Sequence, residues 1–131
     1  MSLSLEILMP DKTLLRAEPV EVRAVDATGS FALLPLHEDF CTALVPSILT
    51  YAEPDGSEHY VALDGGALVL EDGRVSVVTR DGVASDDIDR ASARVADMLR
   101  LRQVQEQEAA TTLRKLVAEL LQRLSQLETR R

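Results

Sequence analysis

The chain has 131 residues, a formal net charge of −8 and a single cysteine. This length accommodates one core of ordinary size plus an appendage, and one cysteine excludes an internal disulfide. Residues 1–85 carry 14 acidic and 5 basic side chains, a net of −9, which argues against binding to nucleic-acid phosphates. Residues 86–131 carry 8 acidic and 9 basic side chains, a net of +1. This arginine-rich part fits either an acidic protein partner or an ordinary solvated helix face.

Neither membrane insertion nor secretion is indicated. No run approaches the roughly 20 apolar residues that a membrane span needs. No basic segment followed by an apolar stretch opens the chain, as a signal peptide would. Any membrane association is therefore expected to come through a partner. The single cysteine, Cys41, fits a reducing cytoplasm, and its neighbours Phe40 and Leu44 lead us to expect a small buried hydrophobe.

Short apolar segments separated by turn signals fill the first 85 residues. Residues 2–9 alternate, with Leu3, Leu5 and Ile7 on one side, which is typical of a half-buried strand. Similar segments occur at 20–24, 31–34, 48–51, 59–63, 67–70 and 75–79, and the turn sequences 53–56 and 71–73 predict hairpins. We expect Gly65-Gly66 to break a strand. The spacing predicts a β-sandwich or barrel of about 8–10 short antiparallel strands.

All six glycines and all five prolines lie at or before Gly82, so nothing forces the chain to turn after that point. Residues 86–131 are therefore predicted to be helical, with Ser85 or Asp86 as the N-terminal cap and Arg130 and Arg131 at the negative end of the helix dipole. Apolar residues recur every three or four positions in two stripes. The stripes are Ile88, Ala91, Val95 and Leu99, and then Leu113, Leu116, Leu120, Leu124 and Leu127.

A polar segment, residues 103–112, separates the two stripes and leaves two arrangements open. In the first, the chain turns there and Thr111-Thr112 caps a second helix, which gives an antiparallel helical hairpin. In the second, one helix of about 45 residues runs for roughly 65–70 Å. Such a helix leaves its leucine stripe in water and needs a partner groove.

The chain lacks the sequence signals of catalysis, of metal binding and of a cofactor. Gly65-Gly66 stands alone, without a phosphate-binding loop around it, and no His/Cys spacing suits zinc. The triplet His37-Glu38-Asp39 is no metal site, because adjacent side chains on an extended segment point in opposite directions. We therefore expect no catalytic residues, no metal and no cofactor, and interpret residues 1–85 as a binding or scaffolding module rather than an enzyme.

Three segments in order resemble one known family. They are residues 29–37 (GSFALLPLH), residues 44–49 (LVPSIL) and Asp64-Gly65-Gly66. This pattern is similar to the epsilon subunit of F-type ATP synthases, called delta in mitochondria. The order of the elements over the whole chain, a sandwich followed by a helical tail, fits the same family.

The resemblance implies a noncatalytic rotor subunit in the central stalk of a proton- or sodium-translocating ATP synthase. It implies two domains: 1–85, which binds the gamma subunit and the ring of c subunits, and 86–131, which is regulatory. The helical tail would reach the beta subunit and restrain ATP hydrolysis. The subunit would be a monomer within the complex, peripheral on the cytoplasmic face of a bacterial cell membrane.

Particular residues follow from the same resemblance. Ser30, Leu36 and His37 would contact the c ring. Basic residues of the tail would contact an acidic segment on beta: Arg90, Arg94, Arg100, Arg102, Arg114, Lys115 and Arg123. Ser30 stands where the family has a carboxylate, which removes one charged ring contact. Ala32 and Leu36 stand where the family has glycine, so we expect different backbone angles there.

A nucleotide motif of the family is incomplete in this chain. Ile88 and Asp89 match its first half, whereas Ser92 and Ala93 stand where the family has Arg-Ala. Since the guanidinium suited to phosphate is missing, we expect no tight ATP binding. These departures indicate a divergent member, and an alternative ion-translocating F-type ATPase fits them. A different hypothesis is a free-standing sandwich adaptor that dimerises through its tail and does not bind gamma.

Overall fold

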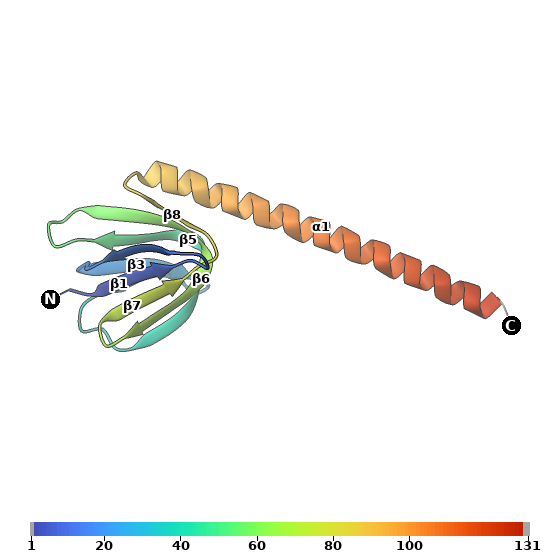
Figure 1. Cartoon of the computed structure of the whole chain (residues 1–131), viewed down its shortest axis with the longest axis horizontal. Coiled ribbons are helices and arrows are strands. Elements are labelled where there is room, and N and C mark those ends of the chain that lie inside the picture. The colour runs from blue at the N-terminus through green and yellow to red at the C-terminus, as the bar shows by residue number, and fades with distance from the viewer. Residues whose placement is uncertain (1, 130–131) are drawn as a thin grey trace. The chain divides into compact units, whose positions relative to one another are not determined.

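The computed structural model describes residues 2–129 and the side chains of residues 2–127. Arg130 and Arg131, predicted to lie at the negative end of the helix dipole, fall outside the described residues. Eight strands precede one helix within the described part (Figure 1). They are β1 (Ser4–Leu8), β2 (Thr13–Ala17), β3 (Glu21–Asp26), β4 (Gly29–Leu33), β5 (Phe40–Ala52), β6 (Glu58–Glu71), β7 (Arg74–Val78), β8 (Gly82–Ser85) and α1 (Ile88–Thr129). The chain forms two compact units, Met1–Leu99 and Arg100–Arg131.

The strands form a β-sandwich with an open sheet, which confirms the predicted fold class. Their order is β2-β1-β7-β6-β5-β3-β4, and β8 pairs with β6 beside this path. The prediction that all strands are antiparallel is wrong at one place, because β1 and β7 are parallel. Turn signals determine only that strands adjacent in sequence run in opposite directions. β1 and β7 are distant in sequence, so no turn relates them.

Strands β5 and β6 are much longer than the short strands predicted. Gly65 and Gly66 do not end β6, and its pairing with β5 continues on both sides of them, from Asp64 opposite Pro46 to Gly66 opposite Leu44. Both glycines have positive φ, 72° and 136°, so they bend the strand instead of breaking it. Before the bend β6 pairs with β8, and after it β6 pairs with β7.

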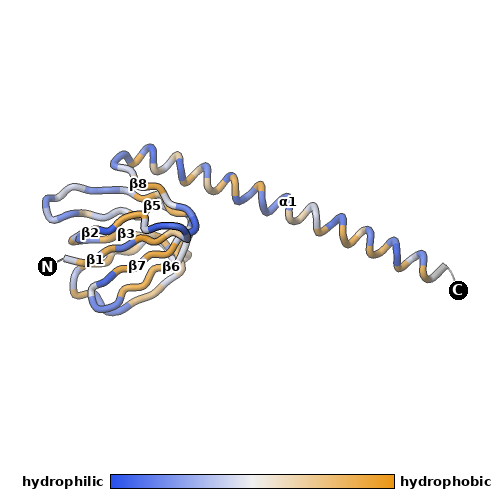
Figure 2. Tube along the Cα trace, viewed as in Figure 1, coloured by the Kyte–Doolittle hydropathy of each residue, from blue (hydrophilic) through white to orange (hydrophobic). Residues whose placement is uncertain are grey.

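The core is aliphatic and draws on both halves of the bent sheet. Buried and more exposed side chains alternate along β1, β3 and β7, and Figure 2 shows the hydropathy changing along the strands. The largest fully buried side chains include Leu3, Leu5, Ile7, Leu33, Leu49, Leu63, Leu68, Leu70, Val22, Val61, Val75 and Val77. Among the charged residues Asp26 is also buried, and it accepts hydrogen bonds from the hydroxyls of Thr28 and Thr42 and from the backbone N–H of Thr28. Each oxygen of this carboxylate therefore has a partner.

The tail is one helix, the second of the two arrangements left open by the sequence. α1 continues through residues 103–112 without a turn, and Thr111 and Thr112 lie inside it rather than at a cap. Good helix formers such as Gln, Glu and Ala fill this segment, so the missing apolar residues do not interrupt the helix. Among the described residues, no helix combines the length and apolar character needed to cross a membrane.

Candidate functional site

An uncharged surface covers the outward side of three adjacent strands. We call it the strand face, and define it as Cys41, Ala43, Ala67, Val69, Ser76 and Val78. The register places these residues in two rows across β5, β6 and β7. All are exposed, and Val69 and Val78 expose 44% and 54% of their surface. Because a lone acidic domain normally covers its surface with charge, a contiguous uncharged face indicates a protein-binding surface.

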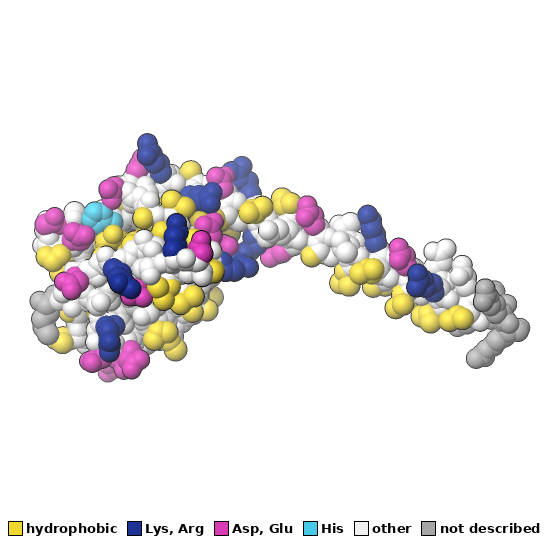
Figure 3. Space-filling view, in the orientation of Figure 1, with side chains coloured by type: hydrophobic (Ala, Val, Ile, Leu, Met, Phe, Trp, Pro, Cys, Tyr) yellow, Lys and Arg dark blue, Asp and Glu magenta, His cyan; other side chains and the backbone are white. Residues whose placement is uncertain are grey.

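Charged side chains border the strand face. Ser76 pairs with Glu6 on β1, and the carboxylate of Glu6 accepts a hydrogen bond of 3.1 Å from Arg16 on β2. Glu71 and Arg74 face each other at the end of the β6–β7 hairpin. An apolar centre with a polar rim is the usual composition of a protein interface. Figure 3 shows acidic and basic side chains over the side of the sandwich that it presents.

The prediction for Cys41 is wrong, because its side chain is exposed. Strand β5 begins at Phe40, so the alternation turns Phe40 and Leu44 toward the core and Cys41 and Ala43 outward. A shallow depression lies next to Cys41 and is lined by Val69, Leu70, Glu71, Asp39 and Phe40. Within residues 2–127, no group of three or more His, Cys, Asp or Glu side chains has a geometry that could hold a metal ion.

The segment expected to contact the c ring forms a strand and an exposed turn. Ser30 lies on β4, and Leu36 and His37 lie in the loop before β5. Leu36 has a φ of 71° and exposes 80% of its surface, so the turn presents an apolar side chain to solvent. Leu36 thus adopts the left-handed backbone that glycine favours, whereas Ala32 does not have positive φ. The neighbouring Leu34 is also exposed.

Asp87, and not Ser85 or Asp86, caps α1. Its carboxylate accepts a hydrogen bond of 2.9 Å from the backbone N–H of Asp89, and its carbonyl accepts the first helical bond, from Ala91. The hydroxyl of Ser85 instead accepts a hydrogen bond from the N–H of Asp87. The predicted cap, Ser85 or Asp86, was therefore wrong, and the cap is Asp87. Ile88 and Asp89, the matching half of the nucleotide motif, occupy the first two positions of the helix and are exposed.

The first three turns of α1 belong to the same compact unit as the sandwich. Ala91 and Met98 are buried, with 1% and 6% exposure, whereas Ile88 and Leu99 are mostly exposed. The buried side of the helix therefore passes through Ala91 and Met98, and the prediction was wrong for Ile88 and Leu99. Arg94 lies on this part of the helix and donates a hydrogen bond of 3.1 Å to the carboxylate of Asp81, before β8.

The basic residues expected to contact beta are distributed along the whole helix. Arg94 binds Asp81, Arg90 lies 3.8 Å from the carboxylate of Asp87, and Arg100 and Arg102 also take part in interactions within the chain. The side chains of Arg114, Lys115 and Arg123 are exposed. The contact with beta stays a prediction.

The second leucine stripe is exposed along the unit Arg100–Arg131. Figure 3 shows hydrophobic side chains gathered on one side of this part of the helix. The exposed members are Leu113, Leu116, Val117, Leu120, Leu121, Leu124 and Leu127. An apolar stripe of this width is suited to bind a groove or another helix.

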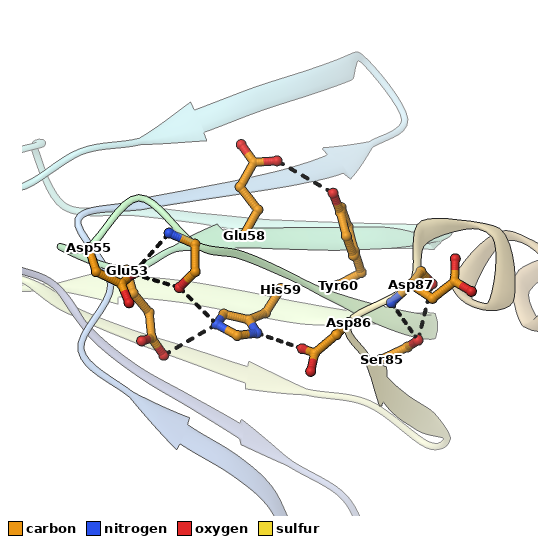
Figure 4. Close-up of polar contacts among 9 residues, drawn as sticks. Glu53, Asp55, Glu58, His59, Tyr60, Ser85, Asp86 and Asp87 are labelled. Carbon is orange, nitrogen blue, oxygen red and sulfur yellow. Dashed lines mark hydrogen bonds and ion pairs between the residues drawn. The ribbon is translucent and has the colours of Figure 1, made fainter.

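A polar cluster around His59 lies where the sandwich meets the start of α1 (Figure 4). Nδ1 of His59 donates a hydrogen bond of 2.7 Å to Asp86, and Nε2 lies 3.6 Å from the carboxylate of Glu53 and 3.3 Å from the hydroxyl of Ser57. The ring stacks on Tyr51, with centroids 5.1 Å apart. The hydrogen bond to Asp86 and the nearby carboxylates raise the pKa of His59.

No sequence signal pointed to this cluster. Its members come from 51–59 and from 85–86, and they meet only because β8 pairs with β6, with Ser85 opposite Tyr60. β8 has four residues and no clear alternation, so the sequence did not predict it as a strand. Without β8, the neighbourhood of Asp86 and His59 could not be inferred.

Comparisons with known proteins agree on one family. Residues 2–85 match the model described as ATP synthase, delta/epsilon chain, beta-sandwich domain. The ATP synthase epsilon chain of Anaeromyxobacter sp. (strain K) is 41% identical over 111 residues, which cover 82% of this chain and 83% of the relative. The ATP synthase epsilon chain 2 of Cereibacter sphaeroides is 38% identical over 95 residues, or 71% of this chain and 65% of the relative.

A solved structure shows the same fold. A chain in the cryo-EM structure of the Euglena gracilis mitochondrial ATP synthase, containing OSCP, F1 and the c-ring, aligns with a TM-score of 0.63 at 23% sequence identity. The alignment covers 72% of this chain and 61% of that chain, so this chain spans about three fifths of the length of its structural relative.

Proposed function

The chain belongs to the ATP synthase delta/epsilon family, as an epsilon chain, and on this basis we propose that it is a noncatalytic rotor subunit that couples the c ring to the gamma subunit. In this proposal the sandwich binds both partners and the helical tail regulates ATP hydrolysis. The subunit is then peripheral, and it reaches the cytoplasmic face of the bacterial membrane through the complex. The observation that carries the proposal, beyond the family, is the strand face.

The strand face is suited to bind gamma. Its six residues are uncharged, whereas residues 1–85 as a whole have a net charge of −9. Flat β-sheet surfaces with small side chains, such as Ala43, Ala67 and Ser76, allow a partner helix or strand to approach closely. Burial of the exposed parts of Val69 and Val78 would supply the hydrophobic contribution to binding.

The proposed ring contact is the exposed turn with Leu36 at its tip. Its φ of 71° holds an apolar side chain in solvent at a backbone conformation that costs an L-residue about 1–2 kcal/mol. Residues in strained backbone conformations are often found at binding sites, which supports a contact between Leu36 and a partner. His37 directly follows this turn, whereas Ser30 lies at the other end of β4, beside the turn between β3 and β4. The proposed contact of Leu36 itself with the ring is apolar.

Introduction of a positive charge on the strand face tests the proposed binding of gamma. Val78→Lys places an ammonium on the strand face, on its β7 side, and we expect the affinity for purified gamma, measured by calorimetry, to fall at least about tenfold. Ala32→Lys is the matched control, because it adds the same charge at an exposed position of β4, at the other edge of the sheet. It should change the affinity less than about twofold. Equal affinities of the two variants would exclude the strand face as the interface.

A truncation tests the regulatory tail. Removal of residues 100–131 leaves the compact unit Met1–Leu99, including buried Ala91 and Met98, intact. If the tail restrains hydrolysis, the ATPase activity of the reassembled complex should rise while gamma binding is retained. Unchanged hydrolysis would show that the tail does not inhibit.

With Ser92 and Ala93 in the nucleotide motif, calorimetry of the isolated chain should detect no ATP binding below about millimolar concentrations.

A further inference from the structure

His59 lies between carboxylates that come from two different parts of the chain. Asp86 belongs to the link between β8 and α1, whereas Glu53 and Asp55 belong to the turn that joins β5 to β6. Figure 4 shows these three carboxylates around the ring, and they are the charged groups that act on it. Tyr51 stacks on one face of the ring. The hydroxyl of Ser57, which lies 3.3 Å from Nε2, donates its own hydrogen to Asp55.

This arrangement favours the doubly protonated ring. Both nitrogens face acceptors: Nδ1 faces Asp86 and Nε2 faces Glu53 and the oxygen of Ser57. An imidazolium has two N–H donors and satisfies both sides. A neutral imidazole has one donor, so in either tautomer a nitrogen lone pair is directed at an acceptor. Loss of the proton therefore removes the ion pairing with both carboxylates, and the neutral ring donates to at most one of them.

The contact with Asp86 holds the residue that immediately precedes the helix cap. The side chain of Asp86 is 85% exposed, and its hydrogen bond to His59 connects it to the sandwich. The next residue, Asp87, caps α1. We propose that His59 and Asp86 form a pH-sensitive latch, which fastens the start of α1 to the sandwich when His59 is protonated and loosens it when the proton is lost.

The direction of the pH dependence follows from the raised pKa of His59. A group whose pKa is higher in the folded chain adds stability that is fully present below its ordinary value of about 6.5 and is lost as the pH rises through the raised value. The latch is therefore closed in mildly acidic solution and open in alkaline solution. It acts in the isolated chain and does not depend on the proposed binding of gamma or the c ring.

Titration of the full chain followed by nuclear magnetic resonance tests the pairing of His59 with Asp86. The titration midpoint of His59 should lie above the ordinary value, and Asp86→Asn should lower it because the charged acceptor is removed. Glu53→Gln should lower it less, since Glu53 is more distant, at 3.6 Å. An unchanged midpoint in Asp86→Asn would overturn the pairing.

Amide hydrogen exchange tests whether the start of α1 loosens when His59 loses its proton. The N–H groups of Asp87, Asp89 and Ala91 are hydrogen-bonded within the link and the first helical turn, so they report its opening. Between pH 6 and pH 8.5, their protection, corrected for the intrinsic rate, should fall about two- to fivefold, the range for a partly exposed ion pair. His59→Gln should remove this dependence, and His37→Gln, which removes the other histidine, should retain it. A dependence that persists in His59→Gln, or that is absent from the wild-type chain, would overturn the proposal.

Discussion

Replacement of Gly66 by alanine should destabilise the sandwich far more than replacement of Gly29. Both glycines have a similar φ, 136° and 124°. A Cβ at Gly29 would meet no atom within 4 Å, whereas a Cβ at Gly66 would overlap the carbonyl oxygen of Val78 and lie 3.1 and 3.2 Å from two more backbone atoms of Val78 and Thr79. The pair separates the cost of the backbone angle from the cost of the close approach.

The expected magnitudes follow from these two terms. Gly29→Ala carries only the conformational cost, about 1–3 kcal/mol for an alanine in this region. Gly66→Ala carries the same cost plus an overlap with backbone, which cannot rotate away as a side chain can. Overpacking of this kind costs about 1–3 kcal/mol or more, so we expect a difference of at least about 1 kcal/mol between the variants. The shift of Val78 should also weaken gamma binding.

Urea unfolding followed by tyrosine fluorescence measures the difference. Both tyrosines, Tyr51 and Tyr60, lie on β5 and β6, so the signal reports on the sandwich and not on α1. If Gly66→Ala and Gly29→Ala have free energies of unfolding within about 0.5 kcal/mol of each other, the argument from close approach is refuted.

Three further substitutions have defined outcomes. Leu36→Gly should raise the free energy of unfolding by about 0.5–1 kcal/mol, because it relieves the left-handed backbone at an exposed position; a loss would mean that the side chain holds the turn. Asp87→Ala should cost the helix cap about 1 kcal/mol and speed amide exchange in the first turn, and unchanged exchange would place the cap elsewhere. Hydrogen bonds from Thr28 and then Thr42 lower the pKa of Asp26, so its stabilisation is present above about pH 4 and is lost as the pH falls through the lowered value. Asp26→Asn should therefore lose less stability than the wild type between pH 7 and pH 3 in urea unfolding, and equal losses would contradict this.

The family and the sandwich were accessible from the sequence because local signals determine them. Alternation at Leu3, Leu5 and Ile7 and the turn at 53–56 predicted strands and a hairpin that the structure has. The resemblance of residues 29–37, 44–49 and 64–66 to the epsilon family is confirmed by the match of residues 2–85 and by relatives that are 41% identical. These features depend on residues that are close in sequence.

The remaining features depend on contacts between distant residues. The parallel pairing of β1 with β7 and the short strand β8 have no turn signal, so the His59 cluster could not be predicted. The strand face was missed because Cys41 was assigned to the core before the start of β5 was known. The choice between a hairpin and one helix was open because no glycine or proline decides it, and the structure has one helix.

The central claim is that this chain is a rotor subunit that binds gamma. Size-exclusion chromatography with light scattering, applied to the full chain with and without purified gamma from the same genome, tests it most directly. We expect a 14.4 kDa monomer alone and a one-to-one complex with gamma. A stable dimer of this chain that does not bind gamma would contradict the account and favour an adaptor that dimerises through the leucine stripe.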